Sequence, residues 1–266
     1  MSDRRYFDAG ASGYDRGFGS VSPTFIPTLL RAAHLEVGHQ VLDVATGTGI
    51  AAEAAARVVG PSGSVVATDV SIPVLEQARQ RLAGTGNVSF AAEDGQALSL
   101  PDTSFDAVIC SMGLMLFPDP ALGLSEFHRV LREKGRIAVS VSTTPERSFV
   151  ARVSIAIARH VPSRAAAAAR FFSLGDASYL RHLFAAVGFH AIETTTETRR
   201  FPFQSFDVWF DPIEKGLGNV AQEYVALPTD LRHTVREEVR RALEMDASPG
   251  GPVEVEVEVL FCSGQK

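Results

Sequence analysis

Residues 41–52 read VLDVATGTGIAA, and this stretch decides the fold class. The apolar run 40–44 predicts a buried strand, the glycines predict a tight turn, and the alanine-rich run 50–59 predicts a helix. Because glycine has no Cβ, the backbone at Gly47 and Gly49 can approach a ligand closely. The start of the following helix presents free backbone N–H groups to the same place. This order of elements predicts a small-molecule site at the carboxyl end of the first strand.

The alternation of strands and helices continues along the chain. Strands that alternate with helices pair in parallel, and continuous apolar strands indicate a sheet that is covered on both faces. We therefore expect an α/β fold with a Rossmann-like, doubly wound sheet. Gly135 stands where the helix before the fifth strand is expected to end. The expected strands are 40–44, 64–68, 87–91, 105–110, 136–142, 189–196 and 253–261.

Two segments of the second half interrupt this rhythm. Residues 143–172 are mostly helical in pattern, and residues 201–249 combine aromatic side chains with an amphipathic helix. We expect both to be lid insertions over the site, although extra packing helices would give the same pattern. The alternating run VEVEVEV at 253–259 predicts a strand with one solvated, acidic face. The aromatic residues of the second segment are Phe201, Phe203, Phe206, Trp209 and Phe210.

Composition limits the classes of function. The chain has 266 residues, 45% of them hydrophobic and 21% charged, which is typical of a globular protein. A net charge of −6 argues against nucleic-acid binding. The cysteines Cys110 and Cys262 are too few for a disulfide framework. No apolar stretch has the length of a signal peptide core or a membrane span, so we expect a cytoplasmic protein.

Three kinds of ligand use a glycine-rich turn of this type. A Walker nucleotide site needs a lysine after its last glycine, and none follows here, so it is excluded. The dinucleotide-binding motif accepts Gly or Ala as the last of its three glycine positions, so Ala52 does not exclude a dinucleotide. The third ligand is S-adenosylmethionine. Asp43 favours it, because an acid there would repel a pyrophosphate but can attract an ammonium group through water.

Further polar residues follow the next strands. Asp69 ends the second strand, where it can accept hydrogen bonds from two ribose hydroxyls, and Val70 can pack on the adenine face. The alternative for Asp69 is an acidic residue at the start of the next helix. After the third strand, Asp94 can accept from the adenine amino group and Gly95 leaves its N–H open, although D-G is also a common turn. Ser111 follows the fourth strand, at the topological switch point, where its carbonyl can meet the ligand's amino group.

The chain resembles a known family over these same residues. The stretches VLDVATGTGIAA, VVATDVS, AEDGQALSLPDTSFDAVICSMGLMLFPDP and EFHRVLREKGRIAVS occur in order at family spacing. Together they resemble the class I S-adenosylmethionine-dependent methyltransferases of the ubiquinone/menaquinone-biosynthesis type over roughly residues 37–142, and residues 173–189 extend the likeness. The family usually reads K-P-G-G before the fifth strand, where this chain has EKGR at 133–136, a departure confined to a turn.

The resemblance implies S-adenosylmethionine as the cofactor and a seven-stranded, mostly parallel sheet with an antiparallel last strand. Asp43, Ala45 and Gly47 would line the methionine end of the cofactor. Tyr14, in GYDRGF, is similar to an N-terminal tyrosine that covers the cofactor in this family. The expected cofactor-binding residues are Tyr14, Asp43, Ala45, Gly47, Gly49, Asp69, Val70, Asp94, Gly95 and Ser111.

The chain then divides into six expected segments, each defined by its position relative to the cofactor. The first is an N-terminal helical cap over the cofactor, followed by the cofactor-binding core and the first helical lid. A continuation of the core, an aromatic helical lid and a final strand complete the chain. The segments are residues 1–36, 37–142, 143–172, 173–200, 201–249 and 250–266.

Methyl transfer is an in-line displacement on an activated cofactor, so the protein mainly aligns the reactants and excludes water. A base is needed only when the nucleophile must lose a proton, and His160 and His233 in the lid segments are the candidates. No histidine shows metal-ligand spacing, so we expect no metal. The aromatic lid predicts a small, partly apolar organic acceptor with an O-, N- or C-nucleophile. The alternatives are a nicotinamide-dependent reductase, a non-catalytic cofactor-binding protein, and an enzyme that uses the sulfonium charge without transferring methyl.

Overall fold

The computed structural model describes residues 21–243 and 251–266. Within them, seven strands form one sheet in the order β3-β2-β1-β4-β5-β7-β6. Neighbouring strands pair in parallel except at β7, which is antiparallel to both β5 and β6. The Rossmann-like, doubly wound sheet with an antiparallel last strand is therefore confirmed. The strands are β1 Gln40–Val44, β2 Ser64–Asp69, β3 Val88–Ala92, β4 Phe105–Ser111, β5 Leu131–Ser142, β6 His190–Phe203 and β7 Val253–Gln265.

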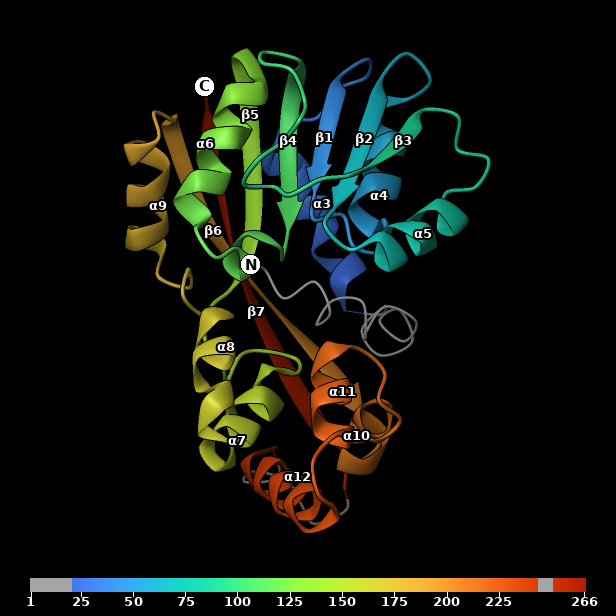
Figure 1. The fold of residues 1–266 in the computed structure, drawn as a ribbon, viewed down its shortest axis with the longest axis vertical. Coiled ribbons are helices and arrows are strands. Elements are labelled where there is room, and N and C mark those ends of the chain that lie inside the picture. The colour runs from blue at the N-terminus through green and yellow to red at the C-terminus, as the bar shows by residue number, and fades with distance from the viewer. Residues whose placement is uncertain (1–20, 244–250) are drawn as a thin grey trace.

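Helices cover both faces of this sheet (Figure 1). The side-chain alternation of β1 shows how the two faces are filled, because Val41 belongs to the core under α3 and α4, whereas Leu42 belongs to the core under α6 and α9. Of the helices in the described ranges, none is both long enough and apolar enough to cross a membrane. The helices of the core are α3 Ile26–Ala32, α4 Ile50–Val59, α5 Ile72–Arg81, α6 Pro120–Val130 and α9 Ala177–Ala186.

Short polar side chains fix where several helices begin. Ser71 accepts a hydrogen bond from the N–H of Val74 at the start of α5. Asp119 and Asp176 do the same for the first turns of α6 and α9. Each cap satisfies a backbone donor that has no partner inside its helix, so the helix start is encoded locally.

The junction between α6 and β5 differs from the sequence expectation. The helix ends at Val130 and β5 begins at Leu131, so Gly135 lies inside the strand and is not a helix cap. Lys134 takes a left-handed φ of 66°. A Cβ at Gly135 would lie 2.8 Å from the carbonyl oxygen of Arg132 and 3.1 Å from that of Asp106 on the neighbouring strand β4. Glycine is required here by the close approach of two backbone segments.

A second group of helices lies beyond the carboxyl ends of the parallel strands, and we call these the lid helices (Figure 1). Both of the irregular segments of the second half contribute to it. The strands β6 and β7 are longer than the sequence indicated, and their pairing runs from His190↔Gln265 to Phe203↔Val253. This long ribbon carries the sheet into the lid. The lid helices are α7 Ala151–His160, α8 Ala165–Arg170, α10 Phe206–Glu214, α11 Asn219–Val225 and α12 Thr229–Leu243.

The aromatic residues of the second segment form the hydrophobic core of the lid. The rings of Phe206 and Phe210 stack at 5.0 Å, and Tyr224 meets Phe210 edge-on at 5.2 Å. Trp209 is 2% exposed and packs against the same rings. Phe206, Trp209 and Phe210 were expected to face an acceptor, but their burial among one another makes them packing residues.

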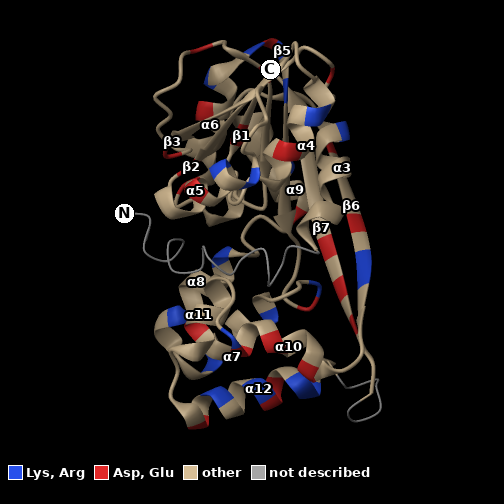
Figure 2. Cartoon of the chain, turned by 90° about the vertical axis from the view of Figure 1, so that its right-hand side faces the viewer, with Lys and Arg blue, Asp and Glu red and all other residues tan. Residues whose placement is uncertain are grey.

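The acidic face of β7 is paired, not simply solvated. Arg200 lies 3.5 Å from Glu254 and 3.3 Å from Glu256, measured between nitrogen and oxygen. Arg147 lies 3.5 Å from Glu256 and also pairs with Glu258. Figure 2 shows the resulting acidic and basic bands along β6 and β7. The alternation predicted the strand correctly, but the partner arginines come from elsewhere in the fold.

Candidate functional site

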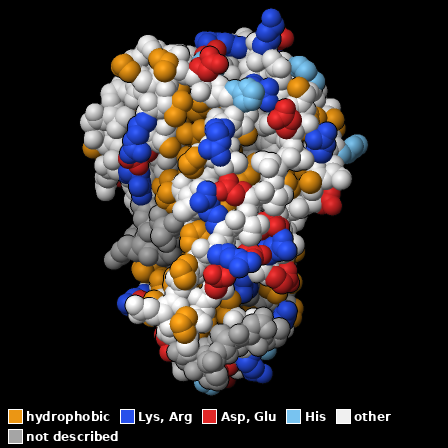
Figure 3. Space-filling model, turned by 180° about the vertical axis from the view of Figure 1, so that it is seen from behind, with side chains coloured by type: hydrophobic (Ala, Val, Ile, Leu, Met, Phe, Trp, Pro, Cys, Tyr) orange, Lys and Arg blue, Asp and Glu red, His pale blue; other side chains and the backbone are white. Residues whose placement is uncertain are grey.

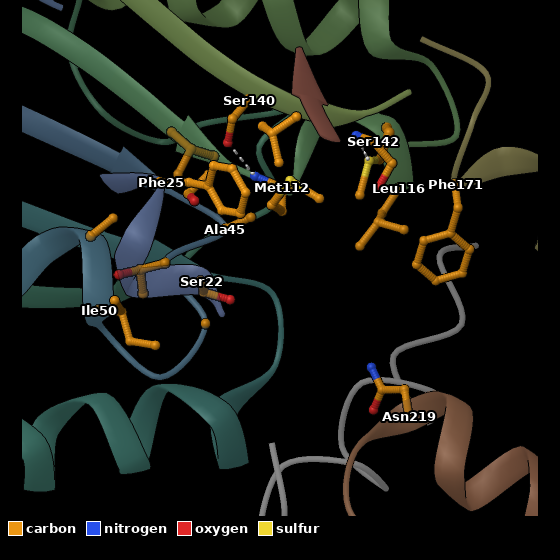
Figure 4. A pocket seen from close by; sticks show the side chains of 18 of the residues that line it. Ser22, Phe25, Ala45, Ile50, Met112, Leu116, Ser140, Ser142, Phe171 and Asn219 are labelled. Carbon is orange, nitrogen blue, oxygen red and sulfur yellow. Dashed lines mark hydrogen bonds between the residues drawn. The ribbon is translucent and has the colours of Figure 1, made fainter. Parts of the chain in front are cut away.

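A cavity of about 300 Å³ opens at the carboxyl edge of the sheet, between the core and the lid helices (Figure 4). This volume is at the lower end of the range for small-molecule sites. Its wall combines the turns after β1, β2, β3 and β4, the end of β5, the segment around α3, and residues of the lid. The cavity therefore lies where the glycine-rich turn predicted a ligand.

The turn after β1 is held open toward the cavity. Ala45 and Gly47 have φ angles of 56° and 58°, and the N–H of Thr46 donates to the carbonyl of Thr68 at 2.9 Å. A Cβ added to Gly47 would meet no atom within 4 Å. Gly47 also lines the cavity, so the space beside it is available to a ligand.

Gly49 has a different role from the one expected. It has a φ of 86°, and its missing Cβ would lie 3.0 Å from Leu82 and 3.1 Å from Ala78. It is not part of the cavity wall. Glycine at this position allows the start of α4 to pack closely on α5, so Gly49 positions the turn without lining the cavity.

Asp43 lies beneath the turn and does not line the cavity, contrary to the placement that the sequence resemblance implied. It is fully buried; Oδ2 accepts from the hydroxyl of Thr46 at 2.6 Å, and Oδ1 has no partner among the described residues. Burial, together with the charge of Asp69 and against the Thr46 hydrogen bond, raises the pKa of Asp43 to about 7. A cationic ligand above the turn would favour its ionised form.

Asp69 connects the turns after β1 and β2. Its Oδ2 accepts from the N–H of Gly47 at 3.0 Å, and its Oδ1 accepts from the N–H of Ser71 at 2.9 Å. Both Asp69 and Val70 line the cavity. A carboxylate oxygen has more than one lone pair, so Asp69 can organise the two turns and still accept from a ligand hydroxyl.

The turn after β3 brings Asp94 and Gly95 to the cavity wall. Asp94 Oδ1 accepts from the N–H of Gln96 at 3.0 Å, which makes it a turn residue as well as a wall residue. A Cβ at Gly95 would lie 2.5 Å from the ring of Phe117. The glycine therefore permits an aromatic ring to close this side of the site.

The turn after β4 packs directly on the turn after β1. A Cβ at Gly113 would lie 2.6 Å from the Cβ of Ala45. Met112 has a φ of 54°, and its N–H donates to the carbonyl and the hydroxyl of Ser140 at 3.0 and 3.1 Å. Ser111 lies on the wall beside them, at the predicted switch point.

The predicted bases are not brought to the cavity. His160 Nε2 lies 3.0 Å from Glu238 Oε2, where α7 meets α12, and His233 is exposed on α12. Neither lines the cavity. Tyr14 lies outside the described residues. In the ranges that the structure covers, no group of three or more His, Cys, Asp or Glu side chains is arranged to hold a metal ion.

The sequence did not predict several residues of the cavity wall. They lie in the segment before α3, at the end of β5 and in the lid, and no local motif marks them. Position at the end of the fifth strand was the one available signal, and it applied only to the serines of β5. The residues are Ser22, Phe25, Ser140, Ser142, Phe149, Phe171 and Asn219.

The charges on the wall are divided between its two sides. The core side carries Asp69, Glu93 and Asp94, and no Lys or Arg among the described residues. On the lid side, Arg147 and Glu258 pair with each other. Figure 3, the view from behind, shows Lys and Arg interspersed with Asp and Glu and no single basic area. The core side of the cavity is therefore suited to a cationic ligand.

Comparison with known proteins shows that the chain is similar to methyltransferases. Residues 41–135 match a family model described as a methyltransferase domain. The chain is 40% identical over 152 residues to a demethylmenaquinone methyltransferase of Clavibacter sepedonicus, an alignment that covers 55% of this chain and 60% of the relative. It is 36% identical over 116 residues to the ubiquinone/menaquinone biosynthesis C-methyltransferase UbiE of Saccharophagus degradans, covering 42% of this chain and 47% of the relative.

The chain thus spans about half the length of the curated relatives it matches. The solved YcgJ protein of Bacillus subtilis aligns with a TM-score of 0.62 at 19% identity, over 91% of this chain and 98% of that one. This likeness shows a shared fold across nearly the whole chain.

Proposed function

Because the chain belongs to the class I S-adenosylmethionine-dependent methyltransferases, we propose that it transfers a methyl group to a small, neutral, partly apolar acceptor. The observation that carries the proposal is the charge of the cavity. Asp69, Glu93 and Asp94 line its core side, and Asp43 lies buried beneath the turn. S-adenosylmethionine carries a sulfonium and an ammonium group, which suit these carboxylates.

The same charges disfavour the nicotinamide-dependent reductase. A dinucleotide would place a pyrophosphate beside the turn after β1, close to Asp69 and above the buried Asp43. No Lys or Arg among the described wall residues of the core side would offset that repulsion. The free space beside Gly47 fits the methionine end of S-adenosylmethionine, and the carboxyl of Asp43 lies buried beneath that turn.

Five wall residues of the core then have a proposed role. Asp69 would accept from the ribose hydroxyls, and Val70 would pack on the adenine. Asp94 and Gly95 would contact the adenine edge, since both lie on the wall after β3. Ser111 would offer its carbonyl to the amino group of the methionine end.

When bound, S-adenosylmethionine supplies a methyl group that is already activated by the sulfonium charge. The residues of this chain would therefore bind and align the acceptor and exclude water. No histidine of the described residues lines the cavity, and Glu258 is paired with Arg147. This arrangement supports an acceptor whose nucleophile needs no strong base, such as an electron-rich ring carbon, an acidic hydroxyl or a neutral amine.

The lid side of the wall indicates the class of acceptor. Phe149 and Phe171 supply apolar surface, and the mutual pairing of Arg147 and Glu258 leaves no net charge there. These residues lie outside the matched stretch 41–135, so the match itself does not identify the acceptor. Two relatives are named for quinone biosynthesis, which makes phenols and quinols the first compounds to test.

The proposal is tested in two steps. Thermal unfolding with S-adenosylhomocysteine and with NAD should show a shift in Tm with the first ligand alone, because a ligand that binds the folded state stabilises it. Incubation with methyl-labelled cofactor and a panel of phenols, quinols and amines should then yield a labelled small molecule. Label found only in protein or nucleic acid would reject the acceptor class. Binding without any transfer would favour the non-catalytic alternative.

The state of the cysteines supports a location for this activity. Cys110 and Cys262 are both free and buried. Unpaired thiols are usual in reducing compartments, so we keep the cytoplasm as the proposed location. Fractionation of the source cells with an antibody against the chain would test it.

A further inference from the structure

The cavity continues past the proposed cofactor side toward the lid. Leu116, Phe171 and Asn219 lie on this part of the wall, with Asn219 coming from the lid (Figure 4). The amide of Asn219 takes part in no hydrogen bond with any other described residue. It faces a cavity with apolar neighbours, so a ligand that filled the space without pairing the amide would lose free energy.

The turn before α11 fixes the place from which the Asn219 side chain extends. Gly216 and Gly218 have left-handed φ angles of 70° and 95°, which turn the chain sharply before α11. Gln222 Nε2 donates to the carbonyl of Gly216 at 2.5 Å. Val220, the next residue of the helix, is 3% exposed and anchors it in the lid core. The position of Asn219 at the cavity wall therefore follows from a fixed turn.

Ser142 presents a second polar group from the opposite, core side. It is the last residue of β5 and is 5% exposed, yet it lines the cavity. Its N–H donates to Met115 Sδ at 3.3 Å, and its hydroxyl has no partner among the described residues. The hydroxyl of Ser140, two residues earlier, already accepts a hydrogen bond from the N–H of Met112. Of these two serines of β5, Ser142 is therefore the one whose hydroxyl keeps both its donor and its acceptor capacity for a ligand.

We propose that Ser142 and Asn219 are specificity-determining residues that bind two polar groups of the acceptor from opposite walls. The inference rests on the proposed function and narrows the acceptor that the site selects. Both side chains donate and accept without carrying charge, so they match neutral hydroxyl or carbonyl groups. Leu116 and Phe171 suit an apolar body between those groups. An analogue that lacks one polar group would leave a side chain unpaired and be selected against.

The test uses protein saturated with S-adenosylhomocysteine and two probes, hydroquinone and 4-methylphenol, which differ by one hydroxyl in place of a methyl group. Calorimetric titration of the wild type should give an affinity for hydroquinone about tenfold higher than for 4-methylphenol. In Asn219→Leu and in Ser142→Ala this preference should fall to within about twofold, because only one polar partner is left. The affinity for S-adenosylhomocysteine should not change in either variant.

Gln204→Leu serves as the matched control, because Gln204 is an exposed amide of the lid outside the cavity wall. It should keep the full preference. Retention of the preference in both Asn219→Leu and Ser142→Ala would overturn the inference. So would failure of both probes to bind the saturated wild type, a result that leaves cofactor binding intact. Failure of S-adenosylhomocysteine itself to bind would instead contradict the proposed function.

Discussion

The carboxylate of Asp69 accepts a hydrogen bond from the backbone N–H of Gly47 at 3.0 Å, and this contact joins the end of β2 to the glycine-rich turn after β1. The two residues come from separate strands, yet together they form one corner of the cavity. A single side chain thus shapes the turn and also forms part of the cavity wall, where the proposed ribose would meet it.

Asp69→Ala should weaken binding of S-adenosylhomocysteine by roughly 1–3 kcal/mol, because charge-assisted hydrogen bonds to the ribose would be lost. Calorimetry measures this change. Asp106→Ala is the matched control: Asp106 also accepts from a backbone N–H, that of Gln40 at 2.8 Å, but it is not part of the cavity wall. An equal loss of affinity in both variants would show that Asp69 acts through the fold alone.

The two glycines of the turn should respond differently to alanine. Gly47→Ala should cost about 1–2 kcal/mol of stability from its positive φ, and it should weaken cofactor binding at least tenfold, because the methyl group enters the open space. Gly49→Ala should cost roughly 2–4 kcal/mol, since strain is joined by overpacking against Ala78 and Leu82. Denaturant unfolding and calorimetry separate the two effects. Normal cofactor affinity in a folded Gly47→Ala protein would contradict the placement of the ligand.

Asp43 should give the cofactor-free protein a characteristic pH dependence. Its pKa is raised from 3.8 to about 7 in the folded state, so the folded protein holds a proton that the unfolded chain has released. The free energy of unfolding should therefore fall as pH rises through this window. Asn at this position carries no titrating proton, so Asp43→Asn should gain stability relative to the wild type over the same interval. Urea unfolding at a series of pH values measures the difference.

Asp106 should give the opposite dependence of stability on pH. Burial alone would raise the pKa of Asp106, but the N–H of Gln40 and the guanidinium of Arg132 lower it. Asp106→Asn should therefore lose stability relative to the wild type above the ordinary aspartate pKa and match it at lower pH.

If the free energies of unfolding of the wild type and Asp43→Asn changed in parallel with pH, this result would contradict the assignment of a proton to Asp43.

The paired charges on the lid side should set the charge preference of the acceptor. Arg147→Gln leaves the carboxylate of Glu258 uncompensated and should raise kcat/KM for a phenol with a cationic side chain relative to a neutral phenol by roughly three- to tenfold. Glu258→Gln should shift the preference toward an anionic acceptor. Arg200→Gln is the control, because Arg200 pairs with acids of β7 but is not part of the cavity wall. Unchanged preferences in the first two variants would show that the acceptor does not approach this pair.

The part of the site that the sequence predicted is the part encoded by short-range patterns. Asp69 ends β2, and Gly47 and Asp94 lie in the turns after β1 and β3, so the parallel strands bring all three to one edge of the sheet. Gly49 was assigned to the turn correctly, but the reason for its glycine lies in α5, which no local pattern reveals.

The lid side could not be predicted because it depends on contacts between distant residues. Arg147 meets Glu258 across more than a hundred residues, and Asn219 reaches the cavity only because two left-handed glycines turn the chain before α11. The aromatic segment was misassigned for a related reason: sequence shows that Phe206 and Phe210 are apolar, but not whether they face a ligand or one another.

A crystal structure of the protein grown with saturating S-adenosylhomocysteine would show whether the cofactor lies across the carboxyl edge of the sheet. We expect ligand density beside Gly47, with the ribose on Asp69, the adenine beside Asp94, and the sulfur facing the space that Ser142 and Asn219 border. Density in another place, or a cavity that stays empty at saturating ligand, would contradict this expectation.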